Sequence, residues 1–216
     1  MRPIIVTVGS LATASVNAIC LSQTPTTGAL TINGALASGG VATLDTPRRV
    51  LITTTGNESA KTFVITGTSL TNQVISESIT GPNAGSAQSV LDYKTVTSIT
   101  ISANAAAALT VGTNGVASSG WVRFDDFAPS DISIQCSVSG TVNYTVQQTL
   151  DDPNSPTNPV NLALVNWFSS PDSNLIAATG NIQSNYAFMP TYARILLNSG
   201  TGSVTGTFIQ SGNVAL

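Results

Sequence analysis

The stretch Asp131–Thr149, DISIQCSVSGTVNYTVQQT, carries the clearest structural signal in the chain. Residues 131–138 alternate between polar and apolar side chains, and residues 141–149 place Val142, Tyr144 and Val146 on one face. Alternation with a period of two is typical of half-buried β-strands. The dipeptide Ser139-Gly140 between the two runs has the chemistry of a tight turn. The stretch therefore predicts a β-hairpin.

Two further hairpins are predicted by the same pattern. One joins 62–67 to 73–80 through a polar turn at 69–72, and the other joins 191–198 to 203–210 through 199–202. Additional short strands are expected at 3–8, 28–33, 47–54, 95–101 and 108–112. The short alanine-rich run 104–108 is expected to form a turn, because it is too short for a stable helix.

The composition also indicates an all-β fold. β-Branched residues are abundant and favour strands, whereas Gly, Asn and Pro punctuate turns. The chain contains only two Lys and two Glu, so it lacks the residues that usually cover helix surfaces. We expect two small β-sandwich domains, immunoglobulin-like or jelly-roll-like, which the length of 216 residues accommodates.

The two halves differ in chemistry, and this difference predicts a domain boundary. Ten of the twelve aromatic residues lie at or after Trp121, whereas every Lys and Glu lies at or before Lys94. The Gly-, Ser- and Asn-rich residues 112–120 have linker chemistry. We predict an N-terminal domain at 1–117 and an aromatic-rich C-terminal domain at 118–216, the latter being the more acidic and the candidate for display.

The charge inventory argues against catalysis. The chain has no histidine, the commonest general acid/base and metal ligand near neutral pH, and only seven basic and ten acidic residues. We expect no enzymatic activity, no catalytic residues and no cofactor. The net charge of −3 and the absence of a basic run argue against direct nucleic-acid binding. No segment is long and apolar enough to span a membrane, and the N-terminal residues predict a first strand rather than a signal peptide.

Two acidic loops are the closest approach to a metal site. Asp125-Asp126 with Asp131 flank one loop, and Asp151-Asp152 begin a proline-rich segment. Oxygen-rich loops bind Ca²⁺, but neither loop has the glycine-pivoted spacing of a calcium loop. Because Asp also favours turns, we expect turns and no metal.

The cysteines and the aromatic residues each have a structural and an alternative interpretation. Cys136 lies on the apolar phase of its strand, so a buried free thiol is favoured over a disulfide with Cys20. The aromatics of the second half either fill its core or include anchors of an intersubunit contact. The candidate interface residues are Arg48, Arg49, Trp167, Phe168, Tyr186 and Phe188.

Several phrases of the chain resemble structural proteins of tailed-bacteriophage virions. In the first half they are PRRVLIT (47–53), FVITGT (63–68), ISESITGPN (75–83) and YKTVTSI (93–99). In the second half they are GTVNYTVQ (140–147), DDP (151–153), YARI (192–195) and SGTGSVT (199–205). The family is β-rich and uncharacterised, and it transfers no site residues.

The resemblance implies a structural role in a phage particle that assembles in the bacterial cytoplasm. A capsid decoration or cement protein is the leading expectation, with the major capsid protein or neighbouring virion proteins as partners and a homo-oligomeric state. A tail, fibre or adsorption component that binds a host glycan or protein is the alternative. Composition alone also leaves a carbohydrate-binding module open.

Overall fold

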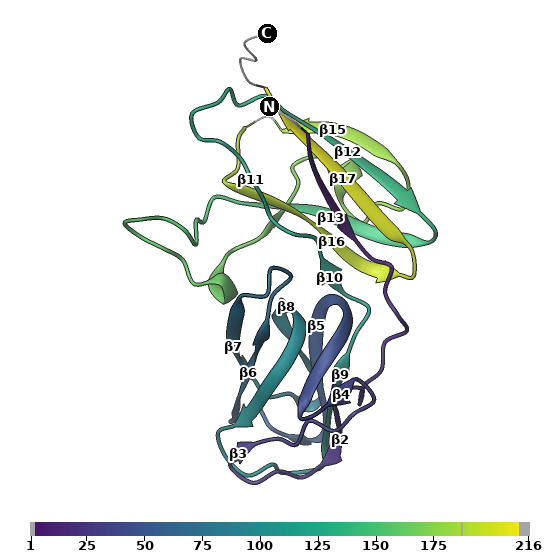
Figure 1. Ribbon diagram of the computed structural model, residues 1–216, viewed down its shortest axis with the longest axis vertical. Coiled ribbons are helices and arrows are strands. Elements are labelled where there is room, and N and C mark those ends of the chain that lie inside the picture. The colour runs from purple at the N-terminus through teal and green to yellow at the C-terminus, as the bar shows by residue number, and fades with distance from the viewer. Residues whose placement is uncertain (1–2, 187, 212–216) are drawn as a thin grey trace. The chain divides into compact units, whose positions relative to one another are not determined.

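The computed structural model describes residues 3–186 and 188–211, in which antiparallel strands dominate and two 3-10 turns are the helical elements (Figure 1). The all-β prediction is confirmed. The chain divides into two compact units. We call Met1–Leu11 with Val116–Leu216 the sandwich unit, and Ala12–Gly115 the inserted unit, because it interrupts the sandwich unit in the sequence.

The sandwich unit consists of two antiparallel sheets that enclose one core. The first sheet has the order β1-β17-β12-β15, and the second has the order β10-β16-β13-β14, with β11 also paired to β16. Their bounds are Ile4–Val8 (β1), Ala117–Ser118 (β10), Val122–Arg123 (β11), Ile132–Ser139 (β12), Val142–Thr149 (β13), Phe168–Ser169 (β14), Ile182–Tyr186 (β15), Tyr192–Gly200 (β16) and Ser203–Gln210 (β17). The 3-10 turns η1 and η2 span Leu162–Leu164 and Ser173–Leu175.

Alternation along the strands supplies the core. In β12, Ile132, Ile134 and Cys136 are buried while the residues between them are exposed. The facing strand β13 buries Val142, Tyr144 and Val146, and Phe208 of β17 joins the same cluster. The predicted buried state of Cys136 is confirmed, and both cysteines are free.

The hairpins predicted from 131–149 and from 191–210 are wrong, although their strands are present. β12 pairs with β17 and β13 pairs with β16, so each predicted hairpin is an arch that passes from one sheet to the other. Alternation and a glycine turn fit both connections, because in either case the apolar faces end in the same core. Local sequence cannot decide between pairing with the neighbour and crossing the core.

Glycines allow the two arches to lie against each other. Gly140 and Gly200 have φ values of +79° and +114°, which side chains disfavour. The amide of Gly202 donates to the Thr141 carbonyl at 2.9 Å, and a Cβ at Gly202 would lie 2.3 Å from the Ser139 oxygen. The close backbone contact thus requires glycine at position 202.

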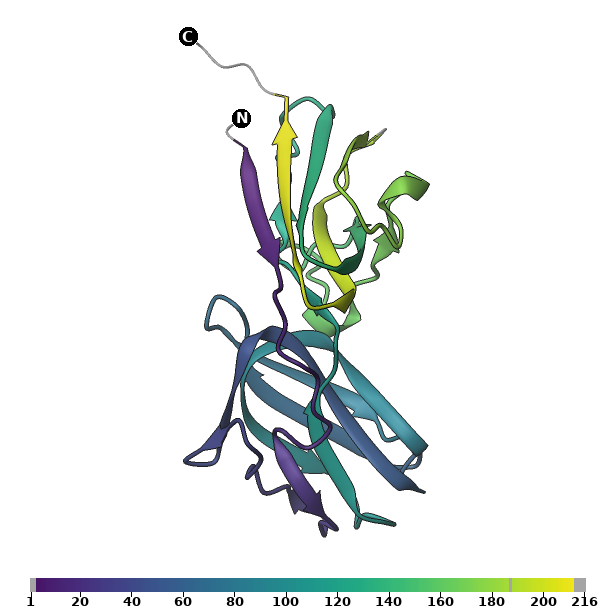
Figure 2. The same ribbon diagram turned by 90° about the vertical axis from the view of Figure 1, so that its right-hand side faces the viewer.

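β1 belongs to the sandwich unit, and this corrects the N-terminal limit of the predicted domains. β1 pairs with β17 along its whole length, from Ile4 opposite Phe208 to Val8 opposite Val204. Figures 1 and 2 both show β1 in purple beside β17 in yellow. The predicted boundary at 117/118 lies close to residues 115 and 116, where the chain returns from the inserted unit to the sandwich unit. Residues 1–11, however, belong to the sandwich unit and not to the first half. Pairing between strands so far apart in the sequence leaves no local signal.

The inserted unit is a single eight-stranded antiparallel sheet of order β2-β9-β5-β8-β6-β7, with β3 beside β8 and β4 beside β5. The bounds are Cys20–Gln23 (β2), Gly28–Ala29 (β3), Ala37–Ser38 (β4), Val41–Asn57 (β5), Thr62–Thr68 (β6), Val74–Thr80 (β7), Asn83–Ile101 (β8) and Leu109–Thr113 (β9). The predicted hairpin of β6 and β7 is confirmed, with Thr62 opposite Thr80. β5 and β8 are much longer than predicted, and register shifts interrupt their pairing.

Candidate functional site

The predicted interface residues Arg48 and Arg49 do not lie on the surface. Arg48 is 1% exposed, and its guanidinium donates to the Asp45 carboxylate and to the carbonyls of Ala12 and Asn114. Arg49 is 8% exposed, lies 3.6 Å from the Asp92 carboxylate and donates to the Ser89 carbonyl. Both arginines therefore make their polar contacts inside the inserted unit. The prediction that they lie at an interface with another subunit is wrong for this chain on its own.

The predicted aromatic candidates separate into three environments. Tyr186 is 3% exposed and packs edge-on against Phe124 in the core, so it is no surface anchor. Trp167 is half-buried. Phe168 and Phe188 are 65% and 45% exposed and remain available for contact.

A cluster of aromatic and charged side chains lies around Trp167. The Trp121 and Trp167 rings meet edge-on with centroids 4.8 Å apart, and Trp121 also meets Tyr192 at 5.9 Å. The Arg194 guanidinium lies 4.1 Å from the centre of the Trp167 ring, and its Nε donates to Gln147 at 2.9 Å. Stacking on an aromatic face stabilises a cation, and here it accompanies the burial of Arg194 to 3% exposure.

The proline-rich loop after β13 is fixed to this cluster by its two aspartates. Asp152 accepts from the Tyr192 hydroxyl at 3.3 Å and from the Arg123 guanidinium at 3.3 Å. Asp151 accepts from the backbone and the side-chain amide of Asn166. The acidic pair predicted here as turn chemistry thus holds the loop in place.

The other acidic loop, Asp125–Asp131, presents the most exposed aromatic side chain in the described structure. Phe127 is 100% exposed, although the neighbouring Phe124 is 1% exposed and belongs to the core. The Phe127 amide donates to the Asp125 carboxylate at 3.0 Å, and the Ala128 amide donates to the Asp125 carbonyl at 3.1 Å. The first bond is that of an Asx turn and the second is that of a β-turn, so the Asp-rich sequence forms the turn that was expected.

Gln210 at the end of β17 ties both ends of this turn to the sandwich. Its side-chain amide donates to the Asp125 carbonyl at 2.9 Å and to the Pro129 carbonyl at 3.2 Å. Its side-chain oxygen accepts from the Asp125 amide at 2.9 Å, and the side chain is nearly fully buried. The loop conformation is thus fixed from inside the unit.

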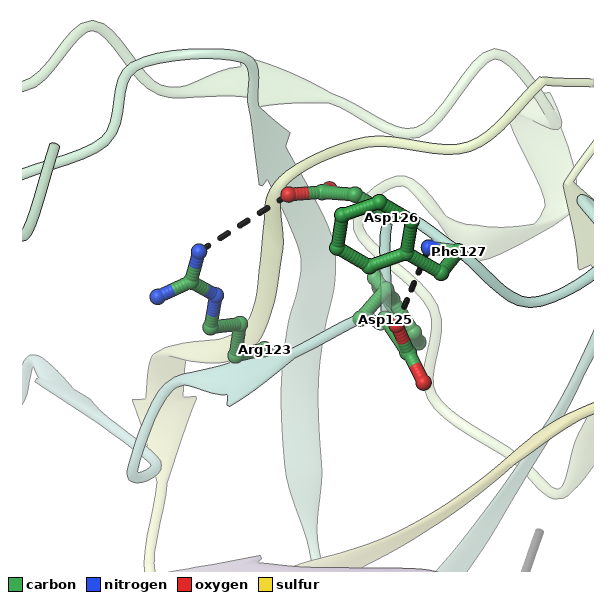
Figure 3. Close-up of a pocket in the computed structure, with 5 residues that line it drawn as sticks. Arg123, Asp125, Asp126 and Phe127 are labelled. Carbon is green, nitrogen blue, oxygen red and sulfur yellow. Dashed lines mark hydrogen bonds and ion pairs between the residues drawn. The ribbon is translucent and has the colours of Figure 1, made fainter.

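An open pocket of about 330 Å³ lies at the base of this loop, lined by residues 123–127 (Figure 3). Figure 3 shows the Asp126 carboxylate facing Arg123, with Asp126 Oδ2 and Arg123 Nη2 3.8 Å apart. Arg123 is about half exposed and is shared between Asp126 and Asp152. The pocket combines one base, two acids and two phenylalanines, which suits recognition of another surface more than proton transfer.

No group of three or more His, Cys, Asp or Glu side chains suited to a metal ion occurs among residues 3–186 and 188–211. In the same part of the chain, no helix is long and apolar enough to cross a membrane.

The buried acids of the inserted unit accept hydrogen bonds from nearby backbone amides. Glu77 accepts from the amides of Val90 and Leu91, and Glu58 accepts from those of Ala106 and Ala107.

Glu77 serves a bulge in β8. The pairing of β5 with β8 shifts register between the Arg49–Asp92 and Leu51–Gln88 pairs. At this shift the amides of Val90 and Leu91 donate to the Glu77 carboxylate. Burial raises the pKa of Glu77, although those two amides and Arg49 act in the opposite direction. The inward-facing carboxylate is therefore a structural device of the inserted unit.

Protein-family models, curated proteins and solved structures offer no match to this chain. Sequence reasoning grouped Phe127 with the aromatics expected in the second core, and its full exposure corrects that expectation. The signal that distinguished it was its position between Asp125-Asp126 and Pro129, which are turn residues rather than strand residues.

Proposed function

We propose that the chain is a non-enzymatic structural protein of a bacteriophage particle, acting as a capsid decoration or cement protein. The observation that carries the proposal is the composition of one sheet face. Among the described residues of β1, β12, β15 and β17, none is Asp, Glu, Lys or Arg. The resemblance of the sequence to phage virion proteins supports the same assignment.

The solvent face of this sheet is covered by hydroxyl and amide groups that bond to one another. Thr7 and Thr205 are 3.0 Å apart through their hydroxyls, and the Gln183 amide donates to Gln135 at 2.9 Å. Ile5 and Ile209 add exposed apolar side chains to the same strands, at 64% and 41%. Free β-rich proteins usually place charges on such faces against association. A face that a neighbouring subunit covers permanently needs no such charges.

In this role the chain clamps neighbouring shell subunits, and the bound state stabilises the shell by mass action. The partners are the major capsid protein or adjacent virion proteins, and the chain itself assembles as a symmetric homo-oligomer. The location is the virion, which assembles in the bacterial cytoplasm.

Quantitative mass spectrometry of purified particles tests this role through the copy number of the chain. We expect a copy number comparable to that of the major capsid protein. Particles that lack the chain should release their DNA at a lower temperature, and added protein should restore the original value. A few copies per particle, with unchanged heat stability of the shell, would contradict a cement role.

The cluster around Trp167 favours a second candidate, a tail or adsorption component that binds a host glycan. The half-buried indole rings of Trp121 and Trp167 offer aromatic surface. Tyr192, which meets Trp121 edge-on, bonds to Asp152 and Asn154 through its hydroxyl, and sugars use both kinds of group. This role predicts few copies per particle and loss of adsorption without the chain. Quenching of Trp fluorescence by host surface polysaccharide, abolished by Trp167→Ala, would support it. Binding of free glycans by the isolated protein without any virion function would instead indicate a carbohydrate-binding module.

A further inference from the structure

We propose that the loop Asp125–Asp131 is the docking anchor of this protein. Phe127 enters an apolar socket on a neighbouring virion protein, and Arg or Lys side chains rim that socket. The inference rests on the proposed function for the identity of the partner as a virion protein.

Hydrogen bonds from the sandwich unit hold both ends of the loop in the unbound chain. Gln210 makes three hydrogen bonds with the backbone of Asp125 and Pro129, and the Ser211 amide donates to the Asp131 carbonyl at 2.8 Å. Phe124, at the entrance of the loop, packs edge-on against Tyr186 and Phe208 in the core. A preorganised loop loses little conformational entropy on binding, and this favours a tight complex.

The ring of Phe127 contributes nothing to the fold through burial. At 100% exposure its entire apolar surface faces solvent, whereas Phe124 three residues earlier is 1% exposed. Aromatic side chains that become desolvated at the centre of an interface dominate binding energies. A fixed turn that holds such a ring in water is the expected form of an anchor.

The charges around the ring specify the chemistry of the partner. Asp125, Asp126 and Asp131 are exposed within the loop, whereas the pocket contributes one base, Arg123. Arg123 is already engaged by Asp126 and by Asp152, at 3.8 Å and 3.3 Å. The remaining field around Phe127 is acidic, so a basic rim complements it, while nucleic acid and anionic membrane surfaces do not.

The test uses particles assembled without this chain as the probe and measures the binding of added purified protein. We expect Phe127→Ala to raise the Kd about 30-fold or more, the loss typical of a central aromatic anchor. Leu164→Ala is the control, because Leu164 is an exposed apolar residue of the same unit, at 70%, to which no contact is assigned, and it should change the Kd less than about threefold. Equal melting temperatures of both variants and the unmodified protein establish that the fold is retained.

The outcomes separate the anchor from the proposed function. If the unmodified protein binds and Phe127→Ala binds equally well, the anchor is wrong while the virion role stands. If the unmodified protein does not bind the particles at all, the decoration role itself fails. Binding should weaken with added salt, and Asp126→Asn should reduce that dependence. An undiminished salt dependence in that variant would overturn the basic rim.

A photo-crosslinker at position 127 identifies the occupant. We expect a crosslink to a shell or tail protein at a site with neighbouring Arg or Lys residues. A crosslink to a second copy of this chain would overturn the assignment of the partner and make the loop a self-association contact.

Discussion

Arg48 lies 3.0 Å from Asp45 through Nη1, and the same guanidinium binds the carbonyls of Ala12 and Asn114. Ala12 begins the inserted unit and Asn114 is its penultimate residue. One buried side chain thus holds together the two points at which the chain enters and leaves this unit. The Asp45 carboxylate also accepts from the Ala12 amide at 2.8 Å.

We expect Arg48→Met to lower the free energy of unfolding of the inserted unit by about 3 kcal/mol. The substitution removes the ion pair with Asp45 and the guanidinium that donates to the Ala12 and Asn114 carbonyls, and losses of buried charged hydrogen bonds are large. Arg123→Met is the control, because its ion pairs are about half exposed and worth little. Urea unfolding measures both, and equal midpoints for the two variants would contradict a structural role of Arg48.

Gly202→Ala should destabilise the sandwich unit by about 2 kcal/mol or more. Its Cβ would lie 2.3 Å from the Ser139 carbonyl oxygen, a backbone atom that cannot move aside without disturbing the neighbouring arch. Gly180→Ala is the matched control, because no atom lies within 4 Å of its added Cβ. Thermal unfolding should separate the two variants, and similar melting temperatures would show that the arches do not pack as described.

Glu77 should make the inserted unit less stable as the pH rises. Burial raises the pKa of Glu77 in the folded state, so the folded chain binds its proton more readily than the unfolded chain. The associated stability is fully present below the ordinary Glu pKa and is lost as the pH increases through the raised value. Urea unfolding of the protein and of Glu77→Gln between pH 4 and pH 8 measures this difference.

The contribution of Glu77 is the stability of the original protein minus that of the variant, and it should fall with pH across this window. A difference that grows with pH would indicate that the amides of Val90 and Leu91 dominate instead. Taking the difference cancels the titration of other acids, among them Asp45. Burial would raise the pKa of Asp45, but the Ala12 amide and Arg48 lower it overall.

Both cysteines should be unreactive in the folded protein. Burial raises the pKa of the Cys20 thiol to about 12 and that of Cys136 to about 11, so neither forms the nucleophilic thiolate near neutral pH. Titration with a chromogenic disulfide reagent at pH 8 should detect no thiol in the native state and two after unfolding. Rapid labelling of one thiol under native conditions would locate an opening of its unit.

Strand positions were the most predictable part of the fold. The alternation in 62–68 and 132–139 follows from one buried and one solvated face, which local sequence encodes. Among the three predicted hairpins, the strand pairing was correct only for β6 and β7, which are neighbours in the sequence and in the sheet. The partners of β12 and β1 depend on a strand near the C-terminus, and no pattern within a short window specifies them.

The candidate site was less predictable than the fold. Burial of Arg48 depends on two carbonyls from distant segments, and exposure of Phe127 depends on a turn that directs its ring outward. Residue type alone favours the opposite assignment for both, since arginine is usually exposed and phenylalanine usually buried. The Asp-rich turn was predictable because its bonds lie within a few residues.

The pairing of β1 with β17 also constrains the order of synthesis and folding. β1 leaves the ribosome before the inserted unit, but its partner β17 follows only after the inserted unit and most of the sandwich unit have been translated. During translation the inserted unit can fold first, while the apolar strand Ile4–Val8 lacks its β17 partner. Closure of the first sheet is then the late step, and a nascent chain stalled before Ser203 should expose β1 to protease.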